Sequence, residues 1–97
     1  MESSIIERII VDEGYTHIRK LPDGTRVAIR KMLYTYGLFV GLDLMGYSHR
    51  YCYETKEEAV ADLEIWNGEG HPPGLWIKCK GALIGDILNP RWSEKNE

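Results

Sequence analysis

The chain has 97 residues, 43% of them hydrophobic, and its 15 acidic and 12 basic side chains leave a formal net charge of −3. This length suits one domain with a modest core, so we expect a single domain over residues 1–97 with a frayed tail at 93–97. The net charge disfavours a general polyanion binder. No apolar run is long enough to span a membrane, and the N-terminal residues lack the basic segment followed by an apolar one that is typical of a signal peptide, so we expect a cytoplasmic protein without a membrane partner.

The first segment with a clear pattern is Ile5 to Val11, where β-branched residues are dense. Such residues favour a strand. A helix stays open as the alternative, because Ser4 and Glu7 have the spacing of a capping box and the isoleucines recur at helical intervals.

A β-hairpin is predicted at residues 22–25, where Asp-Gly stands between two runs of alternating apolar and basic residues. With a two-residue loop, the first strand would place Ile18 on the same face as Val27 and Ile29, because side chains alternate along strands. The opposite face would then carry the basic residues His17, Arg19, Arg26 and Arg30.

Two more strands are expected after the hairpin. One spans Tyr34 to Met45 and contains Gly37 and Gly41, and interior glycines often mark a bend or a close approach to the backbone. The other spans residues 50–54 and leads directly into a helix.

The helix is expected over Thr55–Asn67. Thr55 and Glu58 form a capping box at its start, and Gly68 supplies the left-handed residue that ends it. Its apolar stripe consists of Ala59, Val60, Leu63 and Trp66. The solvent-facing side consists of Glu57, Glu58, Asp62 and Glu64, and we expect Asp62→Ala to change the stability little.

The C-terminal third begins with a turn-rich loop that contains two prolines. Residues 75–80 are predicted to form a short edge strand with Trp76, Lys78 and Lys80 on one side, and residues 82–88 a helical turn. The expected fold class is therefore α+β, an antiparallel meander of four or five strands packed against one helix.

The sequence contains no recognisable motif of a catalytic site. The glycines fit neither a dinucleotide-binding nor a phosphate-loop motif, and the serines stand in no nucleophile motif, so we expect a protein that is not an enzyme and has no cofactor. A zinc site could draw on His49, Cys52, His71 and Cys79. Because a regular strand would put His49 and Cys52 on opposite faces, we expect two free thiols and no metal.

Two stretches resemble known proteins. The run RYCYETKEEA, Arg50 to Ala59, is a last strand entering a capped helix and resembles the end of the arm-binding and AP2-type modules of integrases and transcription factors. This resemblance covers Tyr15 to Trp66, without the extension from Leu75 to Trp92, and implies DNA binding through the sheet. The segment HPPGLWIKCKG, residues 71–81, is similar to small uncharacterised bacterial and phage or prophage proteins and implies no activity.

The function expected from these features is that of a small binding module with a protein partner, contacted through Trp76, Lys78 and Lys80. Tryptophan is enriched at binding hot spots, although a core role for Trp76 stays open. The alternative is a nucleic-acid-binding domain that uses the face with His17, Arg19, Arg26 and Arg30. No motif identifies the partner or the oligomeric state.

Overall fold

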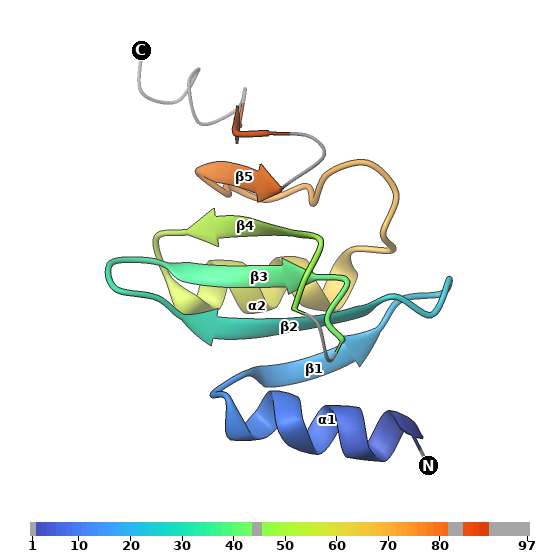
Figure 1. The fold of residues 1–97 in the computed structure, drawn as a ribbon. Coiled ribbons are helices and arrows are strands. Elements are labelled where there is room, and N and C mark those ends of the chain that lie inside the picture. The colour runs from blue at the N-terminus through green and yellow to red at the C-terminus, as the bar shows by residue number, and fades with distance from the viewer. Residues whose placement is uncertain (1, 44–45, 82–84, 90–97) are drawn as a thin grey trace.

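The computed structural model describes residues 2–43, 46–81 and 85–89, and these residues form one six-stranded sheet with two helices (Figure 1). The elements in chain order are α1 (Glu2–Asp12), β1 (Thr16–Lys20), β2 (Arg26–Lys31), β3 (Tyr36–Val40), β4 (His49–Tyr53), α2 (Lys56–Ile65), β5 (Lys78–Gly81) and β6 (Ile87–Leu88). Every strand pairs antiparallel with the next. The expected α+β class, a meander packed against one main helix, is confirmed, with six strands in place of four or five. Neither described helix is long and apolar enough to cross a membrane.

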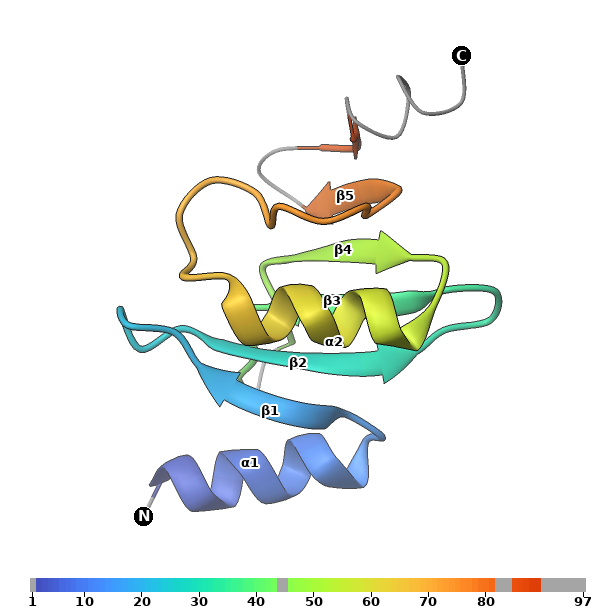
Figure 2. The same ribbon diagram turned by 180° about the vertical axis from the view of Figure 1, so that it is seen from behind.

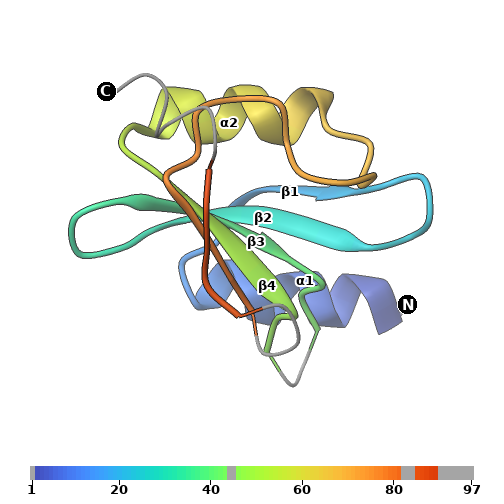
Figure 3. The same cartoon turned by 90° about the horizontal axis from the view of Figure 1, so that it is seen from above.

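The two faces of the sheet are covered differently. Helix α2 lies across β2, β3 and β4 on one side (Figure 2), and we call this side the covered face. Helix α1 lies on the other side of the sheet (Figure 3), beside β1 (Figures 1 and 2), and we call that side the open face. The main core lies between α2 and the sheet and consists of Leu21, Val27, Ile29, Leu38, Val40, Tyr51, Tyr53, Ala59, Leu63, Trp66, Trp76 and Cys79. A smaller cluster on the open face consists of Ile10, Tyr15, Ala28, Phe39 and Leu42.

The N-terminal segment is a helix, so the strand expected over residues 5–11 is wrong and the helical alternative is right. The reason lies at its C-terminal end, where Gly14 adopts a left-handed conformation with φ 99°. The N–H groups of Gly14 and Tyr15 donate to the carbonyls of Val11 and Ile10, the pair of bonds of a Schellman motif. Tyr15 and Ile10 also pack in the same cluster, which completes that motif.

The β1–β2 hairpin has a different register from the predicted one. Its loop runs from Leu21 to Thr25, closed by a hydrogen bond of 2.8 Å from Leu21 N–H to the Thr25 carbonyl, so Arg19 pairs with Val27. A bulge between Thr16 and Arg19, where His17 has φ 55°, adds a second irregularity. A shift of one residue moves every side chain to the other face. The predicted separation is therefore wrong in β1, because Arg19 lies on the covered face and Ile18 packs against the cluster on the open face.

Helix α2 begins as expected. The Thr55 hydroxyl accepts a hydrogen bond from the Glu58 N–H at 3.2 Å and lies 2.9 Å from the Glu58 carboxylate. The apolar stripe is confirmed, since Ala59, Leu63 and Trp66 are buried and Val60 is half-buried. The helix ends at Ile65 with Trp66 as its C-cap, so Asn67 occupies the C′ position expected for Gly68. Gly68, one residue further on, is left-handed as expected, with φ 95°.

Asp62 was predicted on the solvent-facing side of α2, but it is only 3% exposed. The expectation of a solvated Asp62 is wrong since the chain beyond the helix returns over it at Gly74, whose N–H donates to the carboxylate at 3.0 Å. No periodicity within the helix signals this contact, which comes from twelve residues away.

The C-terminal part also departs from the predicted elements. Strand β5 begins only at Lys78 and pairs with both β4 and β6, so it is not an edge strand. The helical turn expected over 82–88 is wrong at Ile87–Leu88, which form β6. Residues 82–84 and the expected frayed tail at 93–97 lie outside the described residues.

The third strand expected over Tyr34 to Met45 is too long, because β3 spans only Tyr36–Val40 and Tyr34 lies in the turn closed by the hydrogen bond from Met32 N–H to the Thr35 carbonyl. Its expected end at Met45 lies outside the described residues.

Candidate nucleic-acid interface

The four basic residues predicted to share one face do not form one cluster. Arg19 is on the covered face, where its Nη1 donates to the carbonyls of Leu63 and Trp66 at 2.5 and 2.9 Å. His17 is exposed in the bulge of β1. Only Arg26 and Arg30 alternate onto the open face, as predicted.

The Arg26 side chain is buried and makes its contacts within the protein rather than with solvent. It is 8% exposed, its Nη1 donates to the Leu42 carbonyl at 3.2 Å, and its Nε lies 3.8 Å from a Glu7 carboxylate oxygen on α1. Its guanidinium therefore connects α1 to the residues that follow β3, which leaves Arg30 as the exposed arginine of the predicted set.

The sheet register adds two cations that the predicted nucleic-acid-binding set lacked. Across the sheet, Phe39 of β3 pairs with Arg50 of β4, and Arg50 pairs with Lys80 of β5. Residues opposite each other on neighbouring strands share a face, so Arg50 and Lys80 lie on the open face with Phe39. The sequence signal for Arg50 is its alternation with Tyr51 and Tyr53, both of which are fully buried on the covered face.

A hollow of about 290 Å³ opens on this face, and we call it the cationic hollow. It is lined by Tyr15, Arg30, Lys31, Met32, Phe39, Tyr47 and Arg50. Phe39 is buried and meets two tyrosines edge to face, Tyr15 at 5.0 Å and Tyr47 at 4.7 Å between ring centroids. The hollow is thus an aromatic group bordered by two arginine side chains of the open face, Arg30 and Arg50.

Gly37 is required beneath this hollow. A Cβ atom at this position would lie 2.6 Å from the Phe39 ring and 3.0 Å from the Met32 sulfur. The interior glycine predicted to mark a close approach therefore does so, and the neighbours that approach it are side chains of the same face.

Two tyrosines that line the hollow, Tyr15 and Tyr47, contact the guanidinium groups of its two arginines. The Arg30 guanidinium carbon lies 5.3 Å from the centre of the Tyr15 ring, a cation–π contact. Arg50 donates from Nη1 to the Tyr47 hydroxyl at 3.2 Å, and its buried Nε has no hydrogen-bond partner among the described residues. Both side chains are thereby positioned by neutral partners and keep donors for an anionic ligand.

One acidic group that interacts with the charge of Arg50 is on the segment before β6. Asp86 pairs with Lys78 at 2.9 Å, and this hydrogen bond lowers the pKa of Asp86, with further lowering by the charges of Lys78, Lys80 and Arg50. Asp86 is exposed at the edge of the sheet, where it pairs with Lys78 and also interacts with the charges of Lys80 and Arg50.

The residues expected to contact a protein partner, Trp76, Lys78 and Lys80, do not form one surface. Trp76 is 2% exposed, lies in the main core on the covered face, and donates from Nε1 to the Pro72 carbonyl at 3.0 Å. Lys78 and Lys80 lie on the opposite face of the sheet. The prediction that Trp76 shares a side with these lysines is wrong because residues 75–77 precede β5, so strand alternation does not reach them.

Among the cysteines and histidines considered for zinc, Cys52 lies across the sheet from the other three, since His49, His71 and Cys79 all lie near Tyr51 on the covered face. Cys79 pairs with Tyr51 on the covered face and Cys52 with Lys78 on the open face, and both thiols are free. Burial raises the pKa of Cys79, and burial lowers that of His49, with a further effect from the charge of His71. Within the described part of the chain, no three His, Cys, Asp or Glu side chains are grouped so that they could hold a metal ion.

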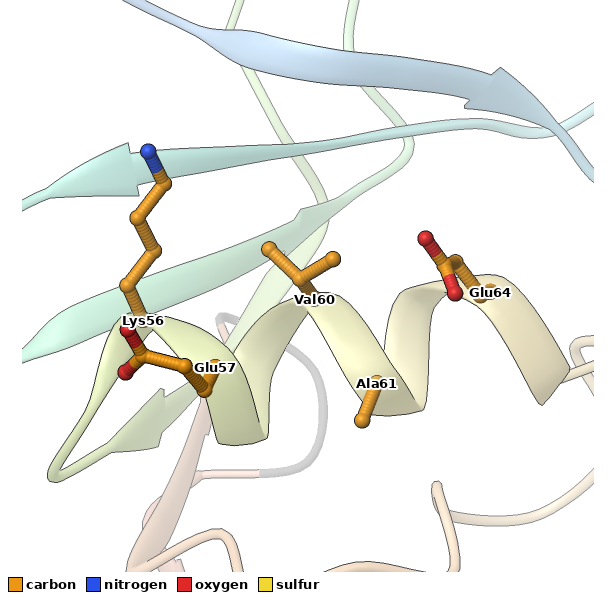
Figure 4. A pocket seen from close by; sticks show the side chains of 5 residues that line it. All are labelled: Lys56, Glu57, Val60, Ala61 and Glu64. Carbon is orange, nitrogen blue, oxygen red and sulfur yellow. The ribbon is translucent and has the colours of Figure 1, made fainter.

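A second depression runs along the outer side of α2 (Figure 4) and measures about 410 Å³. It is lined by Lys56, Glu57, Val60, Ala61 and Glu64. One lysine and two carboxylates on a shallow surface favour no single charge of ligand, so the cationic hollow is the better candidate site.

The chain matches no protein-family model, no curated protein and no solved structure. Its function therefore has to be inferred from the geometry of its own residues.

Proposed function

We propose that this chain is a non-catalytic nucleic-acid-binding domain that uses the open face of its sheet. The observation that carries the proposal is the gathering of Arg30, Arg50 and Lys80 on the open face, two of them around an aromatic hollow. Arginine offers a planar set of donors that matches phosphate oxygens, and aromatic rings beside it suit sugars and bases.

The distribution of charge supports this proposal in spite of the net charge of −3. Helix α2, on the far side of the sheet, contains four carboxylates and one lysine between Lys56 and Ile65. A phosphate chain on the open face would be separated from that helix by the sheet, so local attraction is compatible with an overall negative protein.

Arg50 has the most suitable geometry for a phosphate. The Tyr47 hydroxyl takes one of its donors, and the buried Nε lacks a partner among the described residues. Arg50 is half-buried, so the terminal nitrogens of its guanidinium remain within reach of a phosphate oxygen and can donate charge-assisted hydrogen bonds to it.

The alternative of a protein partner loses its expected anchor, since Trp76 is inside the core. The predicted resemblance to arm-binding and AP2-type modules is compatible with the proposal, because three strands, β2 to β4, run into α2 and present the face away from it. That resemblance remains a prediction.

The test is a titration of labelled oligonucleotides followed by fluorescence anisotropy over a series of salt concentrations. Wild-type affinity should fall steeply with salt, and Arg30→Gln/Arg50→Gln should reduce the slope of log K against log salt by about 1.4 to 1.8, the change expected for two lost phosphate contacts. The matched single variants are Arg50→Gln on the open face and Lys56→Gln on α2, because each removes one positive charge.

Arg50→Gln should weaken binding much more than Lys56→Gln, while circular dichroism confirms that both variants are folded. Equal weakening by the two variants would mean that only net charge matters, and would contradict an interface on the open face. Salt-insensitive binding, or none, by the wild type would reject the proposed function.

A further inference from the structure

The turn that joins β2 to β3 has an unusual composition. A hydrogen bond of 2.8 Å from Met32 N–H to the Thr35 carbonyl closes it, so Leu33 and Tyr34 occupy its two central positions. These positions normally carry Pro, Asp, Asn, Ser or Gly, which favour the turn conformation. Leu33 is 83% exposed and Tyr34 88%, the highest values among the large hydrophobic side chains of the described residues.

The packing of the domain does not account for this pair. In Figures 1 and 3 the β2–β3 turn extends beyond the end of the sheet and away from both helices. An exposed apolar pair at a turn costs solubility, and departures from local sequence rules concentrate at functional positions.

The turn is continuous with the cationic hollow. Arg30 and Lys31 lead directly into it, and Lys31 and Met32, its first residue, both line the hollow. A nucleic acid whose phosphates contact Arg30 and Arg50 would therefore reach the turn within the same complex.

We infer that Leu33 and Tyr34 insert next to a base of the bound nucleic acid, with Tyr34 stacking on an unpaired base and Leu33 as an apolar wedge. This inference rests on the proposed function and adds the form of the ligand, a nucleic acid with an unpaired or easily unstacked base. Stacking on tyrosine is available to every base, and insertion is cheapest where no base pair has to be broken.

The experiment compares two labelled duplexes that differ only by a one-nucleotide bulge. Wild-type protein should prefer the bulged duplex, and Leu33→Ser/Tyr34→Ser should lose that preference, with a five-fold to hundred-fold decrease in affinity for the bulged duplex. The variant should keep the salt-dependent binding to the fully paired duplex. Ile65→Ser is the matched control, because Ile65 is 67% exposed on α2 and lies away from the hollow.

The outcomes separate this inference from the proposed function. Salt-dependent binding without a preference for the bulge, or a preference that survives in the double serine variant, would overturn the inference and leave the function standing. No nucleic-acid binding at all would overturn both. Co-sedimentation with anionic phospholipid vesicles that the double serine variant loses would overturn the inference in favour of a membrane surface.

Discussion

The Tyr53 hydroxyl donates a hydrogen bond of 2.6 Å to Asp62 Oδ2, and the same oxygen accepts the Gly74 N–H at 3.0 Å. This pair joins β4, α2 and the loop before β5 at a buried point of the covered face. Burial, together with the hydrogen bond to Asp62, raises the pKa of Tyr53 well above its usual range, which keeps the hydroxyl protonated as the donor. A Cβ on Gly74 would lie 2.5 Å from both carboxylate oxygens, so only glycine fits so close to Asp62.

Replacing Asp62 should destabilise the domain. Asp62→Ala leaves the buried Tyr53 hydroxyl and Gly74 N–H without an acceptor, and we expect a loss of about 2 to 3 kcal/mol in the free energy of unfolding. Urea denaturation measures it, and Glu64→Ala, at an exposed acidic position of the same helix, is the control with little expected change. A double-mutant cycle with Tyr53→Phe should show coupling between the two residues, and additive effects would mean that the bond is not formed in solution.

Trp76→Ala should act on folding rather than on partner binding. The side chain is buried against Tyr51 at 5.1 Å between ring centroids, and we expect a loss of about 3 to 5 kcal/mol on truncation. Thermal denaturation of Trp76→Ala and of Trp66→Ala, the buried tryptophan of α2, should give losses of similar size. A folded Trp76→Ala variant with unchanged stability would place Trp76 on the surface.

Arg19 should stabilise the C-terminal end of α2. Its guanidinium donates to the carbonyls of Leu63 and Trp66, which belong to the last turn and the C-cap, where a positive charge also interacts favourably with the helix dipole. Arg19→Ala should therefore lower the free energy of unfolding by about 1 to 2 kcal/mol. Lys20→Ala, at the exposed neighbouring position, serves as the comparison in chemical denaturation. Equal small effects of both variants would contradict the observed register of β1.

Stability should decrease in mildly acidic solution because of His49. Burial lowers its pKa below the ordinary 6.5, with a further effect from the charge of His71, so the unfolded chain takes up this proton more readily. The contribution of His49 is fully present above about pH 6.5 and is lost as the pH falls through the lowered pKa.

The test is the free energy of unfolding from about pH 7 down to pH 5. His49→Gln should flatten the decrease, whereas His17→Gln, at the exposed bulge position, should keep the wild-type slope. A slope that is unchanged in His49→Gln would show that other groups cause the pH dependence.

Local sequence determined the features that depend on neighbours along the chain. The Thr55 cap with Glu58, and the stripe of Ala59, Leu63 and Trp66, follow from contacts within one or two helical turns, so spacing alone predicts them. The α+β class likewise follows from the order of alternating and helical patterns. The Schellman signal at Gly14 was also local, and it outweighs the β-propensity of the isoleucines before it.

Only the tertiary structure decided the face of Arg19, the burial of Asp62 and Trp76, and the assembly of the cationic hollow. Each depends on pairing between distant segments: the bulge at His17 and the longer loop set the register of β1, and the loop around Gly74 closes over α2. A register shift of one residue exchanges the two faces of a strand without changing its composition. For this reason the sequence alone does not reveal that Arg50, four strands into the sheet, lies beside the same hollow as Arg30.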